Sequence, residues 1–227
     1  MPTIIFRPNP TPPPFVPKRY LTFTALEDDV TIGYIYFSED YEVQDAGLNI
    51  EYSLDNGDTW QPYEMALTEE DANLITLQNR ESVMFRGNNA NLAYYIEEQD
   101  DYQGTKFIID GLVLANGDVT SLLNGIGGDL NQPEYCYYYM FHGCTGLTTA
   151  PSLPATTLAT SCYTSMFNGC NNLNYVEAMF LTTPGNTYTS SWLLNVAANG
   201  TFVKNSQATW DVTGANGVPI GWTITTA

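Results

Sequence analysis

The sequence predicts a mainly β protein, with short helices, in which an N-terminal β-sandwich precedes a short leucine-rich-repeat stack. Two observations favour this fold class. The first half contains short runs in which apolar and polar residues alternate, and the chain has 16 tyrosines, which favour strands. The second half contains a self-similarity with a spacing of 26 residues, which indicates stacked repeats.

Composition and charge limit the classes of partner. The chain has 227 residues, of which 44% are hydrophobic and 14% charged, as expected of a globular protein. Its net charge of −18 is uneven: residues 1–110 hold six Lys/Arg and 20 Asp/Glu, whereas residues 111–227 hold one and five. This charge repels phosphates and anionic lipids, so we expect no nucleic-acid and no membrane partner. A solvated surface and attraction of a basic partner or a cation both remain open.

Residues 1–18 are predicted to form a proline-rich, extended anchoring arm. Seven of the 13 prolines lie between Pro2 and Pro17, and this density disfavours helices and strand ladders. A tail without a partner is the alternative. The start lacks a basic segment followed by an apolar run, so we expect no secretory signal. We therefore expect the protein to be assembled without export. The predicted anchoring residues are Ile4, Ile5, Phe6, Pro12, Pro13, Pro14, Phe15 and Val16.

Residues 19–110 are predicted to form an acidic, sandwich-like β domain. Period-2 or β-branched runs indicate strands, and the segment 69–77 stays open between a helical turn and a loop. Within this domain, Ser-x-Asp-x-Gly-x-Thr-Trp resembles an Asp-box, a β-hairpin motif of sialidases and other β-proteins. We expect a structural role, because a sialidase also needs an arginine cluster and the chain has only four arginines. The expected strands lie near residues 20–25, 31–37, 48–54, 82–85 and 106–109, and the hairpin residues are Ser53, Asp55, Gly57, Thr59 and Trp60.

Residues 111–227 are predicted to form the leucine-rich-repeat-like domain with a C-terminal cap. Cys136–Leu147 aligns with Cys162–Leu173 without gaps, and weaker copies are expected at Leu122–Ile126 and, 27 residues after Met166–Cys170, at Leu193–Ala197. We interpret each copy as a short helical stub that ends at Gly or Asn and leads into a strand near Leu147 or Leu173. The predicted repeat core comprises Cys136, Met140, Phe141, Cys144, Leu147, Cys162, Met166, Phe167, Cys170 and Leu173.

The cysteines and the single histidine indicate packing rather than chemistry. The spacing Cys-x7-Cys is not that of a zinc site. In the weaker copies the position of the second Cys holds Ile126 and Ala197, so this position accepts small apolar side chains. We therefore expect buried, reduced cysteines, with a disulfide as the alternative. One histidine, His142, makes a catalytic triad or a histidine-based metal site hard to build. We therefore expect no catalytic residue, metal or cofactor, although weak calcium binding by residues 97–101 stays open.

The repeat Cys-Tyr-x-x-Met-Phe-x-Gly-Cys-x-x-Leu resembles the BspA-like leucine-rich repeat of gut bacteria and their phages. The segments Arg19–Asp28, Ser53–Trp60 and Asn199–Ile224 also look like the β-domain and end cap of such proteins. The resemblance covers about residues 19–227 and is more specific for fold than for function.

This resemblance implies a non-enzymatic virion structural protein, a head fibre or capsid decoration protein of a crAss-like phage; the alternative is a bacterial cell-surface adhesin. In the first setting the arm would bind capsid or other virion proteins, and the body would present a surface to a host protein or glycan. A homo-oligomer, by analogy a trimer, is expected. The candidates for an exposed aromatic face are Tyr137, Tyr138, Tyr139, Tyr163 and Trp192.

Overall fold

A computed structural model describes residues 20–38, 45–98, 100–128 and 132–227, and the predicted anchoring residues lie outside this part of the chain. The fold is mainly β, as predicted, and five of the observed strands match the expected runs. The elements are β1 (Leu21–Ala25), β2 (Val30–Ser38), β3 (Ile50–Ser53), β4 (Gln61–Pro62), β5 (Ile75–Leu77), β6 (Ser82–Gly87), β7 (Tyr94–Ile96), β8 (Asp101–Asp110), β9 (Val113–Asn116), α1 (Ser121–Asn124), β10 (Leu147–Thr149), β11 (Tyr175–Ala178), β12 (Thr201–Lys204) and β13 (Thr223–Thr226).

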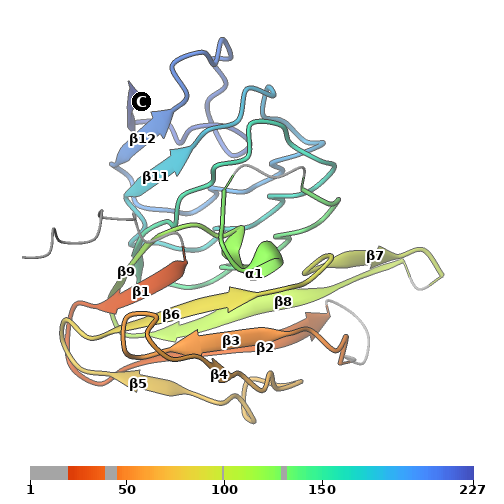
Figure 1. The fold of residues 1–227 in the computed structure, drawn as a ribbon. Coiled ribbons are helices and arrows are strands. Elements are labelled where there is room, and N and C mark those ends of the chain that lie inside the picture. Colours follow the sequence, from red (N-terminus) through yellow and green to blue (C-terminus); the bar gives the residue numbers. More distant parts are fainter. Residues whose placement is uncertain (1–19, 39–44, 99, 129–131) are drawn as a thin grey trace, which may run out of the picture.

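Two sheets contain all the strands of the described residues. One has the order β13-β12-β11-β10-β9-β1-β6-β3-β4, and the other has the order β5-β2-β8-β7. From β9 to β13 the neighbouring strands are parallel, whereas β9-β1-β6-β3-β4 are antiparallel. The repeat stack and the β-domain therefore share one sheet, as Figure 1 shows.

The antiparallel half of the large sheet packs against the four-stranded sheet and makes the sandwich. Aromatic rings fill the space between the layers: Phe23 of β1 and Phe85 of β6 contact Phe107 of β8, with ring centroids 4.9 Å and 5.3 Å apart. All three side chains are buried. Edge-on ring pairs of this kind add about 1 kcal/mol each beyond the area they bury, so this triplet holds the two layers together.

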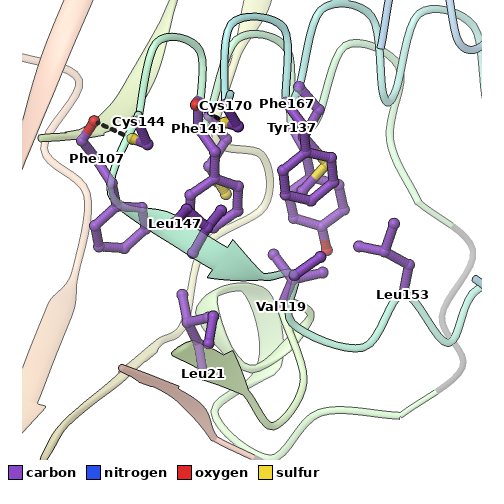
Figure 2. Close-up of a cluster of buried hydrophobic side chains, with 14 of the residues drawn as sticks. Leu21, Phe107, Val119, Tyr137, Phe141, Cys144, Leu147, Leu153, Phe167 and Cys170 are labelled. Atoms are coloured by element: carbon purple, nitrogen blue, oxygen red, sulfur yellow. Dashed lines mark hydrogen bonds between the residues drawn. The ribbon is translucent and has the colours of Figure 1, made fainter. Parts of the chain in front are cut away.

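β8 also begins the repeat stack. The Phe107 N–H donates to the Met140 carbonyl at 2.8 Å, as the Phe141 N–H donates to the Met166 carbonyl at 2.9 Å. The Phe107, Phe141 and Phe167 rings stack in one column with 5.3 Å between neighbouring centroids (Figure 2). A single buried cluster runs from Leu21 to Trp222. The predicted boundary at 110/111 thus lies within a segment that belongs to both the sandwich and the stack.

The repeats are rungs joined by a regular backbone ladder. In the rung 135–144 every second N–H donates to the next rung, and the N–H groups between them donate three residues back within the same rung. The rung 161–170 repeats this pattern toward residues 187–194, so the 26-residue spacing between the full copies is confirmed. The first interface has Tyr137 N to Cys162 O at 3.0 Å, Tyr139 N to Thr164 O at 3.2 Å, Phe141 N to Met166 O at 2.9 Å and Gly143 N to Asn168 O at 2.8 Å.

The predicted helical stubs are wrong for the stacked rungs, which are successive turns. Tyr139, Ser165 and Ser191 have φ of 60°, 51° and 51°, and these left-handed residues prevent an α-helix. Each of them donates its N–H away from its own rung, to Thr164 O, Ser190 O and Asn216 Oδ1 respectively. A left-handed non-glycine residue costs on the order of 1 kcal/mol, and the hydrogen bond that it makes offsets a similar amount.

Both weaker copies need correction. The third rung follows at 26 residues, not 27, because Phe167 N pairs with Trp192 O and left-handed Asn195 corresponds to Gly169. Leu193 is buried in the Phe167 slot, whereas Leu194 is exposed. The first predicted copy is the helix α1, which contacts β6, and Ile126 of this copy is 59% exposed. β8 occupies the place that this copy was expected to take.

The C-terminal segment closes the stack. The Asn216 side chain accepts the Ser191 N–H at 2.8 Å, so it replaces the carbonyl of a further rung. The indole N–H groups of Trp192, Trp210 and Trp222 donate to the carbonyls of Gly217, Phe180 and Ala197. These bonds satisfy buried polar groups while the rings cover the core.

The predicted repeat core is buried throughout, and all four cysteines are buried and free. Cys144 and Cys170 repeat one contact: each thiol donates to the carbonyl of the Phe in the preceding rung, Phe107 and Phe141, at 3.2 Å and 2.9 Å (Figure 2). Burial raises the pKa of Cys144 to about 12, because the apolar surroundings disfavour the thiolate. These cysteines are therefore small core residues with low reactivity.

The 26-residue register can be tested with two neighbouring leucines. We expect Leu193→Ala to lower the free energy of unfolding by about 2–5 kcal/mol, because it opens a cavity in a packed column. Leu194→Ala should change it by less than about 0.5 kcal/mol, because that side chain is exposed. Urea denaturation measures both values, and a larger loss at Leu194 would favour the 27-residue register.

The thiols should react only when the core opens. In native buffer, we expect a thiol reagent to label none of the four cysteines within minutes, and to label all four in denaturant. Absorbance of the released chromophore or the mass of the labelled chain measures this. Rapid labelling of the folded chain would contradict the buried positions.

Candidate binding surface

The predicted hairpin residues come together as a structural turn. The Ser53 hydroxyl donates to Asp55 Oδ1 at 2.7 Å, and the same carboxylate accepts the Thr59 N–H at 2.9 Å. Gly57 has φ of 91°, and its carbonyl accepts the Trp60 indole N–H. These bonds to the charged form lower the pKa of Asp55 to about 2, with the Thr59 side chain as the largest cause.

The predicted exposed aromatic face is mostly core. Tyr137, Tyr163 and Trp192 are fully buried, and Tyr138 is 6% exposed. Only Tyr139 of these five residues is partly exposed. The Tyr137 and Tyr163 rings stack on each other at 5.7 Å inside the rungs, so they serve packing.

A different set of aromatic residues reaches the surface where the β7–β8 hairpin meets the first rung. The rings form a connected series with centroids 4.9 Å apart for Tyr95 and Tyr102, 4.4 Å for Tyr102 and Tyr138, and 4.5 Å for Tyr138 and Tyr139. Apart from Tyr138, these tyrosines are partly exposed. We call the series the tyrosine row, which comprises Tyr95, Tyr102, Tyr135, Tyr138 and Tyr139, flanked by Phe37 and His142.

Three elements hold the tyrosine row in place. Tyr95 and Tyr102 are paired opposite each other in the antiparallel β7–β8 ladder, so both project on one side of the hairpin. Tyr139 belongs to the first rung, where its N–H is fixed by Thr164. In Figure 1, β7 and the start of β8 extend to one side of the molecule, away from β1. The backbone that carries the row is therefore hydrogen-bonded in the β7–β8 ladder and in the first rung.

Carboxyl groups surround one end of the tyrosine row. Glu97, Glu98 and Asp100 lie in the turn between β7 and β8 and are exposed. The Tyr95 hydroxyl donates to Asp100, and this bond is the main reason that the pKa of Tyr95 is raised to about 12. Asp101 is 1% exposed, and its Oδ1 has no hydrogen-bond partner among the described residues. This end of the row favours positive charge.

Rings beside carboxylates can bind cations and flat apolar groups. The molecule itself contains such a contact: the Arg86 guanidinium lies 4.1 Å from the Trp60 ring centroid and 2.7 Å from the Glu51 carboxylate. Cation–π contacts of this kind contribute about 0.5–1 kcal/mol at exposed sites. Tyrosine also occurs often among the residues that dominate protein interfaces.

The described residues contain no group of three or more His, Cys, Asp or Glu side chains that could hold a metal ion. Within the same part of the chain, no helix has the length and apolarity needed to cross a membrane. Comparison with family models, curated proteins and solved structures finds no match to this chain.

The tyrosine row was missed in the sequence, although one signal for part of it was present. Between the two full copies, Tyr137 is matched by Tyr163, whereas Tyr138 and Tyr139 are matched by Thr164 and Ser165. Tyr137 and Tyr163, which keep the residue type, are fully buried, whereas Tyr139, where the type changes, is partly exposed. Nothing comparable in the sequence connects Tyr95 and Tyr102 to the repeat, because their contact depends on the fold.

The hairpin gives a prediction with a defined pH dependence. We expect Asp55→Asn to lower the Tm at pH 7, since it removes the charge that Ser53 and Thr59 stabilise. The folded-state pKa of about 2 lies below the ordinary value of 3.8, so this stabilisation is present above pH 4 and is lost as the pH falls toward 2. Thermal unfolding at several pH values measures the difference in Tm, which should shrink in that range.

The control for the hairpin variant is Asp58→Asn, in the same turn and exposed. It should leave the pH dependence of the Tm unchanged. An Asp55→Asn difference that stays constant from pH 7 to pH 2 would contradict the assigned role of the carboxylate.

Proposed function

We propose that this chain is a non-enzymatic structural protein of a larger assembly and that the tyrosine row is the surface through which it binds another polypeptide there. The observation that carries the proposal is the row itself, in which four partly exposed tyrosine rings are connected by ring contacts and lie beside carboxyl groups. Rigid tyrosines lose little conformational entropy on binding.

The construction of the body is consistent with this role. One buried cluster extends from the sandwich to the C-terminal cap, and the backbone ladder connects each rung to the next. Such a body keeps its surfaces in fixed relative positions. It suits a component that must hold an orientation within an assembly.

The assembly that we propose is a bacteriophage virion, in which the chain is a head fibre or capsid decoration protein. The support is the resemblance of the Cys136–Leu147 repeat to BspA-like repeats, together with the proline-rich segment 1–18 as an attachment arm. The alternative is a bacterial cell-surface adhesin, to which the same repeat resemblance leads.

Particle incorporation tests the proposal. In a phage that carries this gene, we expect Tyr95→Ala to reduce the amount of the chain in purified particles by about tenfold or more, as expected for loss of one tyrosine that contributes strongly to an interface. Deletion of residues 1–18 should remove the chain from particles while the body stays folded. Quantitative mass spectrometry of the particles measures both effects.

Tyr94→Ala is the matched control, because Tyr94 is the neighbouring, exposed residue of β7 and makes no ring contact with the row. The Tyr94→Ala chain should be present in purified particles in the same amount as the natural chain. Recovery of the chain on the envelope of uninfected bacteria, with none in particles, would overturn the virion setting in favour of the adhesin.

A further inference from the structure

The N-terminal segment and the body have opposite charge. Residues 1–19 contain three of the seven basic residues, Arg7, Lys18 and Arg19, and none of the 25 acidic residues. The rest of the chain has four basic and 25 acidic residues. A cationic segment attached to a strongly anionic body is attracted to the carboxyl-rich places on its surface.

The same segment has the composition of a polyproline ligand. Its prolines include the pairs Pro10/Pro13 and Pro14/Pro17, each spaced by three residues. A polyproline II helix has three residues per turn, so the members of each pair lie on one edge of it, about 9 Å apart. Segments of this kind bind to aromatic-lined grooves at low entropic cost, because their bound conformation is largely preformed.

The tyrosine row offers a complementary surface. Tyr102 and Tyr139 are the partly exposed rings on either side of the buried Tyr138, at centroid distances of 4.4 Å and 4.5 Å from it. They are therefore at most about 9 Å apart, the length of one polyproline turn. Carboxyl groups at Glu97, Glu98 and Asp100 lie at the end where a basic side chain would be placed. The Arg86 contact with Trp60 and Glu51 shows how this combination of ring and carboxylate holds a guanidinium.

We infer that the tyrosine row binds residues 1–18 of a neighbouring copy of this chain, with prolines on the rings and Arg7 or Lys18 near the carboxyl groups. This rests on the proposed function and names the polypeptide that the surface takes. Exchange of these segments between copies links them into a homo-oligomer.

Length and position favour a neighbouring copy. Eighteen residues in polyproline II geometry reach about 50 Å, whereas a body of this size has a radius of gyration of about 17 Å. The segment leads into β1, which in Figure 1 lies at the opposite side of the molecule from β7. From there, docking on its own tyrosine row would need a path around the body, whereas docking on a neighbouring copy would not.

A peptide-binding measurement tests the inference directly. The chain without residues 1–18 is a suitable receptor, because the whole buried cluster lies between Leu21 and Trp222. Fluorescence anisotropy of a labelled peptide of residues 1–18 should show saturable binding that weakens between about 50 mM and 500 mM salt. We expect about tenfold weaker binding with Tyr95→Ala and no change with Tyr94→Ala.

Charge is tested separately, with matched numbers of substitutions. Replacing Glu97, Glu98 and Asp100 by Gln, Gln and Asn should lower the affinity for the peptide by about tenfold. The same type of replacement at Asp58, Glu64 and Glu70, which are exposed elsewhere on the body, should leave the affinity unchanged. A peptide with Pro10→Ala and Pro13→Ala should bind less tightly than the natural one. The Tm of each receptor variant verifies that it is folded.

Sedimentation of the full chain tests the exchange between copies. The full chain should form oligomers that Tyr95→Ala or deletion of residues 1–18 reduces to monomers. Peptide binding with a monomeric full chain would show docking within one chain and overturn the exchange. Absence of peptide binding, or binding that Tyr94→Ala weakens as much as Tyr95→Ala, would overturn the inference altogether.

The two proposals fail in different ways. If the peptide does not bind but Tyr95→Ala still removes the chain from particles, the row binds another virion protein and only the inference is wrong. If the peptide binds but particles contain no chain, the oligomer stands and the virion role is wrong.

Discussion

The backbone bond from Phe107 to Met140 is the constraint on which the rest of the architecture depends. β8 is hydrogen-bonded to β2 inside the sandwich, and the same strand offers the first N–H to the rungs. A repeat rung cannot bury its apolar face alone and needs a neighbour. Here the sandwich provides that neighbour, so two good rungs and a third, atypical one suffice for a packed stack.

This shared strand also accounts for the place of the tyrosine row. The β7–β8 hairpin continues past the point where the rungs attach. The first rung brings Tyr135 and Tyr138 against it, and Tyr139 stacks on Tyr138. Rings from the sandwich and the stack therefore meet at the surface only because the two are fused. A sandwich or a stack alone would present fewer of them.

Much of the fold could be predicted from the sequence, because alternation and repetition are local signals. The five expected strands, the 26-residue spacing and the buried cysteines follow from such patterns. The helical stubs were wrong because a Gly at the end of a short apolar run is compatible with a helix and with a series of turns, and the inter-rung bonds decide between them. The role of β8 and most of the tyrosine row depend on contacts between distant segments, which no local pattern contains.

The alternation of hydrogen bonds within the rungs has a consequence for how such a chain can change its length. Two sets of N–H groups alternate along a rung: one donates to the next rung, and the other donates within the same rung. Adding or removing one whole 26-residue unit leaves every N–H in its set. An insertion of a single residue in the segment 135–144 would exchange the two sets beyond the insertion. The N–H groups that donate to the next rung would then point into their own rung. Growth by duplication of entire units is thus compatible with this backbone, whereas gradual lengthening is not.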